Sequence, residues 1–248
     1  MSSFRGIRIA NQIDEIGGFE EGILYVTDNQ TVIDFLKSAN VPVAGYEKDN
    51  DSNLKCDYLF MDLDEVEDED FEAAYLREKG LPLFIADTAR TIIRELSLSD
   101  IDELFKLYKH PEVTRFMEPL FDYNVEIEYE KNYIEYIYKF YGYGMWLVFD
   151  KETRELIGRA GIETRDESCL EENQAELGYV IRPDLWKRGL AYEVCSKIIK
   201  LAREKYRLNS LIARCDKENL ASIGLLEKLG FRLKKELDGN DLLFYLKL

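Results

Sequence analysis

The sequence predicts an α/β protein built from two domains, and three observations predict it. Short apolar stretches alternate with helical patterns in the first third of the chain, which is typical of a small parallel sheet. Two apolar stretches at 144–149 and 156–162 are joined by a polar turn, which indicates antiparallel strands. A strand, a basic turn, a glycine and a helix follow one another over 175–202. We therefore expect a small parallel-sheet domain over 1–88 and a larger α+β domain over 89–248.

Charge separates the two predicted domains. The chain carries a formal net charge of −16, and residues 1–88 hold 7 Lys and Arg against 20 Asp and Glu. Residues 89–248 hold 26 against 29 and are close to neutral. An acidic surface repels the phosphates of nucleic acids, so we expect no nucleic-acid partner.

The apolar residues and cysteines indicate a cytoplasmic protein without a membrane partner. No apolar run approaches the ~18 residues of a spanning helix, and residues 1–16 lack the apolar stretch of a signal peptide. His110 is the only histidine, so a histidine-based triad or metal site is not expected. The cysteines form no C-x-x-C pair, which indicates free thiols in a reducing compartment. They are Cys56, Cys169, Cys195 and Cys215.

The first domain is predicted from short apolar runs and capped helices. Residues 1–20 carry no firm periodic signal and stay unassigned, and Asp28 is placed to cap a helix. The remaining runs give the order β-α-β-β-α-β of a small Rossmann-like parallel sheet. Strands are expected at 22–27, 41–46, 58–61 and 83–86, and helices at 31–39 and 70–79.

One segment of this domain, Asp62-Leu63-Asp64-Glu65-Val66, resembles the D-x-D-x-[TV] nucleophile loop of HAD-type phosphatases. Two carboxylates in such a loop can hold Mg²⁺ while one of them attacks phosphorus. However, the match lies on the third expected strand rather than the first, and no G-D-x-x-x-D metal motif follows it. We therefore favour a solvated acidic strand end in a degenerate Rossmann-like module.

The second domain begins after a junction at 86–89. Residues 90–96 alternate as a strand, and Ser99 caps a helix that ends near Tyr108. The segment H-P-E-V-T-R-F follows at 110–116. A tyrosine-rich stretch then predicts a packed helix, with Tyr129, Tyr133, Tyr136 and Phe140 at helical spacing.

A strand–turn–helix unit organises this domain. Glu176 to Ile181 alternates as a strand, and Pro183 ends it because proline cannot donate to a strand ladder. The helix after Gly189 carries one apolar stripe at helical period. That stripe consists of Ala191, Val194, Cys195, Ile198, Ile199 and Ala202.

The turn between this strand and helix suits a phosphate group. Free backbone N–H groups and the positive end of the helix dipole converge there. Gly189 lets the backbone approach closely, while Lys187 and Arg188 add full charges. Neither G-x-x-x-x-G-K-[ST] nor G-x-G-x-x-G is present, which excludes the better-known phosphate loops. The alternative is an ordinary connection with solvated basic residues.

Three stretches, in order, resemble the GNAT family of N-acetyltransferases. The turn Trp186-Lys187-Arg188-Gly189-Leu190-Ala191 is similar to the family's acyl-CoA loop, Q/R-x-x-G-x-G/A. Its tryptophan resembles the W-x-x-G-x-A of the branch with the ribosomal-protein N-terminal acetyltransferases. The other two are the P-E-V-T-R segment and the helix from Asn219, N-x-x-S…L-E-K-L-G-F, which follows a strand at 208–215 and precedes a closing hairpin. The resemblance spans about 90–248 and implies a mixed central sheet.

This resemblance implies an enzyme that moves an acetyl group from acetyl-CoA to a primary amine by direct attack. The branch favours a protein or peptide N-terminus as acceptor, although lysines, antibiotics and polyamines also offer amines. The residues implied to bind the cofactor are backbone groups of Tyr179, Val180 and Ile181, the turn residues Trp186, Lys187, Arg188, Gly189, Leu190 and Ala191, and the helix residues Asn219 and Ser222.

The resemblance also implies catalytic residues. Glu176 stands where many family members place a carboxylate base, often acting through water, and Glu163 is a weaker second candidate. Leu226 stands where many members have a tyrosine acid for the leaving thiolate. Ser222 or solvent therefore has to supply that proton.

Two other functions remain open at this point. The missing tyrosine also fits a catalytically weak acyl-CoA-binding regulatory protein. Asp62 and Asp64 leave a HAD-like phosphatase as a remote third alternative.

Overall fold

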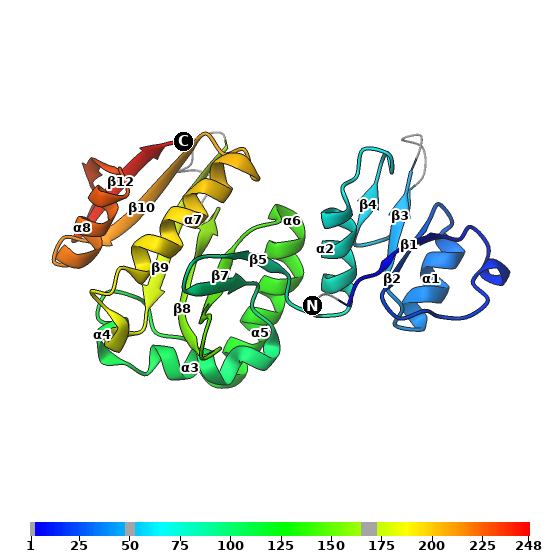
Figure 1. Cartoon of the computed structure of the whole chain (residues 1–248), viewed down its shortest axis with the longest axis horizontal. Helices are drawn as coiled ribbons and strands as arrows, with labels where there is room; N and C mark the ends of the chain where they lie inside the picture. The colour runs from blue at the N-terminus through cyan, green and yellow to red at the C-terminus, as the bar shows by residue number, and fades with distance from the viewer. Residues whose placement is uncertain (1–2, 48–52, 165–172) are drawn as a thin grey trace. The chain divides into compact units, whose positions relative to one another are not determined.

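The computed structural model describes residues 3–47, 53–164 and 173–248 and divides the chain into two compact units (Figure 1). The units are Met1–Leu83 and Phe84–Leu248. This division lies five residues before the boundary expected at 88/89. Within the described ranges, no helix is long and apolar enough to cross a membrane.

The first unit is a small parallel sheet, as predicted, with the strand order β1-β2-β3-β4. The helix α1 connects β2 to β3, and α2 follows β4 (Figure 1). The elements are β1 (Gly6–Ile9), the 3₁₀ turn η1 (Ile13–Glu15), β2 (Ile23–Thr27), α1 (Gln30–Ser38), β3 (Val43–Tyr46), β4 (Leu59–Phe60) and α2 (Asp68–Glu78).

The two helices cover opposite faces of this sheet because the side chains of β2 alternate. Tyr25 packs with Ile33 and Leu36 of α1, whereas Leu24 and Val26 pack with α2. All five of these side chains are fully buried. The unit therefore has a small apolar core on each side of the sheet.

Two expectations for this unit were wrong. The segment expected as its last strand at 83–86 forms β5 (Phe84–Asp87), which pairs antiparallel with β6 (Thr91–Arg94) of the second unit. The fourth strand of the small sheet is instead β1, which pairs parallel with β2 and has no strong apolar alternation. The cap of α1 is Asn29 rather than Asp28, since the Asn29 side chain accepts the Thr31 N–H at 2.9 Å.

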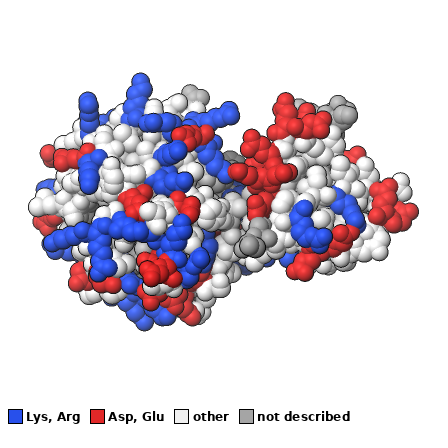
Figure 2. All heavy atoms as spheres, in the orientation of Figure 1, with Lys and Arg blue, Asp and Glu red and all other residues white. Residues whose placement is uncertain are grey.

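The second unit is an eight-stranded mixed sheet with the order β11-β12-β10-β9-β8-β7-β6-β5. Its neighbouring strands pair antiparallel except for β9 and β10, which are parallel. Figure 2 shows Lys and Arg side chains gathered over this unit. The further strands are β7 (Met145–Asp150), β8 (Leu156–Glu163), β9 (Gln174–Ile181), β10 (Ser210–Asp216), β11 (Arg232–Glu236) and β12 (Asp241–Lys247).

Helices pack on this sheet, and α7 lies against β8 and β9 (Figure 1). In the apolar stripe of α7, four side chains are fully buried and Ile199 is partly buried. Burial also raises the pKa of the Cys195 thiol, so that it stays protonated. Cys195 and Cys215 are buried free thiols and Cys56 is half-buried, whereas Cys169 lies outside the described residues. Along the chain, α7 (Leu190–Glu204) precedes β10 and α8 (Leu220–Lys228) follows it.

The long connection between β6 and β7 is helical, but only part of the predicted tyrosine packing is found. Tyr133 is buried, whereas Tyr129, Tyr136 and Phe140 are exposed by 45%, 61% and 81%. A π-helical turn over Tyr133–Tyr138 shifts the later side chains around the helix axis, so that Tyr138 is buried in place of Tyr136 and Phe140. Tyr129 precedes this turn and lies on the exposed side of the helix that leads into it. The elements are η2 (Leu98–Asp100), α3 (Ile101–Tyr108), α4 (Pro111–Thr114), α5 (Tyr123–Asn132), the π turn η3 (Tyr133–Tyr138) and α6 (Lys139–Tyr141).

A buried ion pair joins this helical connection to the sheet. Both carboxylate oxygens of Glu130 accept hydrogen bonds from the Arg159 guanidinium, at 2.6 and 3.1 Å. The Glu130 side chain is fully buried and that of Arg159 is 8% exposed. Water cannot replace a lost partner at this depth, so the pair fixes α5 against β8.

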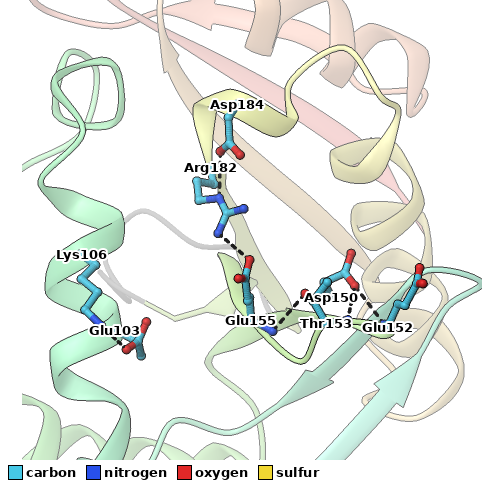
Figure 3. Close-up of polar contacts among 8 residues, drawn as sticks. All are labelled: Glu103, Lys106, Asp150, Glu152, Thr153, Glu155, Arg182 and Asp184. Atoms are coloured by element: carbon cyan, nitrogen blue, oxygen red, sulfur yellow. Dashed lines mark hydrogen bonds and ion pairs between the residues drawn. The ribbon is translucent and has the colours of Figure 1, made fainter.

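We expect Glu130→Gln to lower the free energy of unfolding by about 3 kcal/mol, because it leaves the Arg159 charge buried without a counter-charge. Urea denaturation measures this change. As a control, Glu103→Gln removes the exposed pair with Lys106 in Figure 3 and should have no measurable effect. A Glu130→Gln protein as stable as the wild type would contradict a structural role for the buried pair.

Candidate active site

The candidate site lies where β9 and β10 separate. The two strands pair in parallel only at Ser210↔Gln174, Leu211↔Ala175 and Ile212↔Glu176. Beyond Glu176, β9 continues beside β8 as far as Ile181, while β10 continues beside β12 as far as Asp216. The sheet is therefore open between the last residues of β9 and those of β10.

The separation turns a row of β9 backbone groups toward the opening. The Arg182 N–H donates to the Ile157 carbonyl of β8 at 2.8 Å. Every second residue of an antiparallel strand bonds to the same neighbouring strand. The backbone groups of Val180 and Gly178 therefore also bond to β8. The N–H and C=O groups of Tyr179 and Ile181 consequently point to the β10 side. The Ile181 carbonyl accepts the Trp186 indole N–H at 2.6 Å. The Tyr179 amide groups and the Ile181 N–H face the opening.

The loop after β9 brings the start of α7 to the same place. The 3₁₀ turn η4 (Pro183–Leu185) leads to Lys187 and Gly189, which have φ angles of +62° and +77°. Gly189 is the N-cap of α7, and no side chain caps the helix there. The first N–H groups of a 15-residue helix are therefore presented without a side-chain acceptor.

Arg182 braces the beginning of this loop. Its guanidinium donates to Asp184 at 2.8 Å and to Glu155 at 3.2 Å (Figure 3). Glu155 belongs to the turn between β7 and β8, where the Asp150 carboxylate accepts the N–H groups of Glu152 and Thr153, each at 2.9 Å. The loop is thus attached to a turn that is itself ordered by hydrogen bonds.

The end of the loop is braced by residues that sequence reasoning missed. Arg90, the residue before β6, donates to the Arg188 carbonyl and to Glu193 in the first turn of α7. Burial raises the pKa of Glu193, but hydrogen bonds from Thr88 and Arg90 outweigh it and hold that pKa below its usual value. The Glu193 carboxylate is therefore charged at neutral pH. A cavity of about 370 Å³ opens beside Arg90 and Arg188.

Tyr179 and Ser222 meet across the opening. Their hydroxyl oxygens are 2.7 Å apart, and burial raises the pKa of Tyr179, so it remains a neutral hydroxyl. Ser222 lies in the first turn of α8, where its N–H donates to the Asn219 side chain at 3.1 Å. Asn219 is thus the cap of α8. Leu226 is 1% exposed and packs in the core, so no hydroxyl stands at that position.

Glu176 and Glu163 lie side by side on the other face of β9. They are directly paired across β8 and β9, so their side chains share a face. Arg214 of β10 approaches the Glu176 carboxylate at 3.5 Å, and Glu176 is 13% exposed. The Tyr133 hydroxyl donates to Glu163 at 2.5 Å, so a buried tyrosine of the helical connection contacts the second candidate base. Val180, on the same face, packs with Leu107 and Val113.

The phosphatase-like segment of the first unit forms no comparable site. Asp62 follows β4, a two-residue edge strand, and its carboxylate accepts the N–H of Asp64 at 3.0 Å. Among the described residues, no group of three or more His, Cys, Asp or Glu side chains is placed to hold a metal ion. The Asp62 segment therefore carries no metal site within the described residues, and the candidate active site lies in the second unit.

The chain belongs to the GNAT acetyltransferase family. The family model "Acetyltransferase (GNAT) domain" matches residues 90–232, which is more than half of the chain. The chain is also 31% identical over 150 residues to the uncharacterized N-acetyltransferase p20 of Bacillus licheniformis. That match covers 58% of this chain and 80% of p20. The protein is therefore a GNAT N-acetyltransferase.

Solved structures share the fold of the second unit. A structure of RimL, a ribosomal L7/L12 alpha-N-protein acetyltransferase in complex with coenzyme A, has a TM-score of 0.56 at 14% identity. It covers 67% of this chain and 98% of RimL. A spermidine N-acetyltransferase from Vibrio cholerae, in complex with CoA and spermine, has a TM-score of 0.53 at 18% identity. It covers 63% of this chain and 95% of that enzyme.

Proposed function

We propose that this chain transfers the acetyl group of acetyl-CoA to a primary amine at the opening between β9 and β10. The proposal is carried by one observation, the parting of these strands next to a helix start that no side chain caps. A strand edge with free amide groups suits the amide-containing pantetheine arm, and the helix start suits a diphosphate. The bound CoA of two proteins with this fold supports the same donor.

In this proposal the donor is held along the loop and the strand. The backbone of Arg188, Gly189 and Leu190 binds the diphosphate, together with the charges of Lys187 and Arg188. The backbone of Tyr179–Ile181 binds the pantetheine amides and the thioester carbonyl. Trp186 holds the end of β9 through its hydrogen bond to the Ile181 carbonyl. The small side chain of Ala191 leaves room for the ligand beside the first turn of α7. Asn219 positions Ser222 beside the pantetheine arm.

The catalytic groups are then divided between the two faces of β9. Glu176 accepts a proton from the attacking amine, directly or through water. The nitrogen bonds to the thioester carbon, and collapse of the tetrahedral intermediate breaks the C–S bond. Ser222, which Tyr179 holds by its hydroxyl, donates a hydrogen bond to the leaving sulfur. The leaving thiolate takes the Ser222 hydroxyl proton, Ser222 regains a proton from solvent, and Glu176 releases the amine proton to solvent, so that no net proton is gained or lost.

Calorimetry with acetyl-CoA tests the proposed donor. We expect saturable binding, followed by release of free CoA when an accepted amine is added. No binding at about 1 mM acetyl-CoA to a folded sample, a concentration that reveals even weak affinity, would contradict the proposal.

Ser222→Ala tests the proposed leaving-group contact. We expect kcat to fall about 100-fold, the lower end of what a positioned proton donor contributes, because solvent can also protonate a thiolate. The KM for acetyl-CoA should change little, because Asn219 and the loop still hold the arm. Steady-state rates with a saturating amine measure both constants, and an unchanged kcat would assign the proton donation to solvent.

For the acceptor we propose a protein or peptide N-terminus. The support is the W-x-x-G-x-A form of the loop, which resembles the ribosomal-protein branch. Acetylation of short peptides by their α-amine, compared with free spermidine and an acetyl-capped lysine peptide, tests this choice. Acetyl-CoA binding without turnover on any of these amines would instead favour an acyl-CoA-binding regulatory protein, because Leu226 replaces the tyrosine acid.

A further inference from the structure

Arg90 contacts the proposed diphosphate loop at two points. Its Nη1 donates to the Arg188 carbonyl at 2.9 Å. Its backbone N–H and its Nε donate to the two carboxylate oxygens of Glu193, at 2.9 and 2.8 Å, and its Nη2 lies 2.6 Å from the same carboxylate. The Arg90 side chain therefore joins the loop to the first turn of α7.

The bond to Arg188 fixes the orientation of one peptide group. In a trans peptide the C=O and the following N–H point in opposite directions. Because the Arg188 carbonyl points to Arg90, the Gly189 N–H points away from Arg90, on the side of the loop that Arg90 does not occupy. Without this bond, the Arg188–Gly189 peptide could rotate, because Gly189 has a φ of +77°, and its carbonyl could turn toward a phosphate.

The bond to Glu193 sets the charge at the helix start. A carboxylate in the first turn stabilises the helix dipole but repels a bound phosphate. Arg90 neutralises that carboxylate with several hydrogen bonds and holds it on its own side of the loop. The positive end of α7 is then left for an anionic ligand.

We propose that Arg90 and Glu193 are positioning residues for the diphosphate of coenzyme A. They act by holding the Arg188–Gly189 peptide and by neutralising the first turn of α7. The inference rests on the proposed function of the same loop. It gives both residues a role in binding one part of the donor, the diphosphate, and none in the chemistry of the thioester.

The test compares two donors in Arg90→Met and Glu193→Gln. Acetyl-CoA carries the diphosphate, whereas S-acetyl-N-acetylcysteamine keeps the thioester and lacks it. We expect kcat/KM for acetyl-CoA to fall at least 10-fold in Arg90→Met, which releases the Arg188 carbonyl and leaves the Glu193 charge without its partner. The fall should be smaller in Glu193→Gln, which removes that charge together with the anchor of Arg90. In both variants kcat/KM for the truncated donor should stay within twofold. The dissociation constant of CoA, measured by calorimetry, should rise by the same factor as the loss with acetyl-CoA.

Arg94→Met is the matched control, because Arg94 lies four residues after Arg90, in β6, and forms a comparable bidentate pair with Asp100, away from the loop. We expect it to bind CoA as the wild type does. Equal losses with both donors, or CoA binding unchanged in Arg90→Met, would overturn the inference. Failure of the wild-type protein to bind CoA would instead overturn the proposed function.

Discussion

Gly189→Glu abolishes acetyl-CoA binding while the protein remains folded. The new side chain starts on the Arg90 side of the helix start, so it adds a negative charge next to the proposed diphosphate and competes with it for the local positive charge. Juxtaposed like charges cost several kcal/mol. Each 1.4 kcal/mol is tenfold in affinity, so we expect a loss of at least about 100-fold. Calorimetry measures the loss directly, and circular dichroism verifies the fold.

The space around Gly189 makes this variant interpretable. A Cβ atom there would meet nothing closer than the Arg90 Nη2 at 3.8 Å, so the loop has room for the first atom of a side chain. The backbone strain of a side chain at φ +77° is about 1–2 kcal/mol. Gly189→Asn is the matched control, because asparagine tolerates this conformation and adds no charge. Tight binding of acetyl-CoA by Gly189→Glu would place the diphosphate elsewhere.

Glu176→Gln lowers kcat about 10²- to 10⁴-fold and changes acetyl-CoA binding little. The amide keeps the shape of the carboxylate but cannot take a proton from the amine, and general bases contribute on this scale. Turnover by the variant then depends on the amine that is already neutral in solution. Its rate should therefore rise more steeply with pH than that of the wild type. Steady-state rates across the pH range measure this effect.

Two further variants test whether the proposed base is Glu176 itself or a neighbouring group. Arg214→Met removes the ion pair to Glu176 and keeps the carboxylate, so its kcat should stay well above that of Glu176→Gln. Glu163→Gln removes the neighbouring carboxylate and should cost less than Glu176→Gln. An unchanged rate for Glu176→Gln at all pH values would assign the base to another group, and a larger loss for Glu163→Gln would assign it to Glu163.

The elements that carry the site could be predicted because their signals are local. The strand expected at 176–181 is part of β9, and the helix expected after Gly189 begins at Leu190. Proline, glycine and an apolar stripe at helical period all lie within one short segment, so no distant contact is needed to interpret them. The same holds for Asn219, whose role as a cap depends only on the next turn.

The contacts that shape the site could not be predicted because they join distant segments. Arg90 and Glu193 are 103 residues apart in sequence, and Tyr179 and Ser222 are 43 apart. The pairing of Glu163 with Glu176 depends on the register of two strands, which no local pattern gives. The prediction that 83–86 belongs to the small sheet failed for the same reason. The partner of a short strand depends on which sheet edge the fold brings next to it, so 84–87 pairs with β6 and β1 pairs with β2.

The central claim is that the backbone between Arg188 and Leu190 binds the diphosphate of coenzyme A. A crystal structure of the protein with bound CoA tests it most directly. The account predicts diphosphate oxygens within hydrogen-bond distance of the Gly189 and Leu190 N–H groups, and the pantetheine arm along Tyr179–Ile181. Loop N–H groups already bonded to protein acceptors, with CoA bound elsewhere, would contradict it.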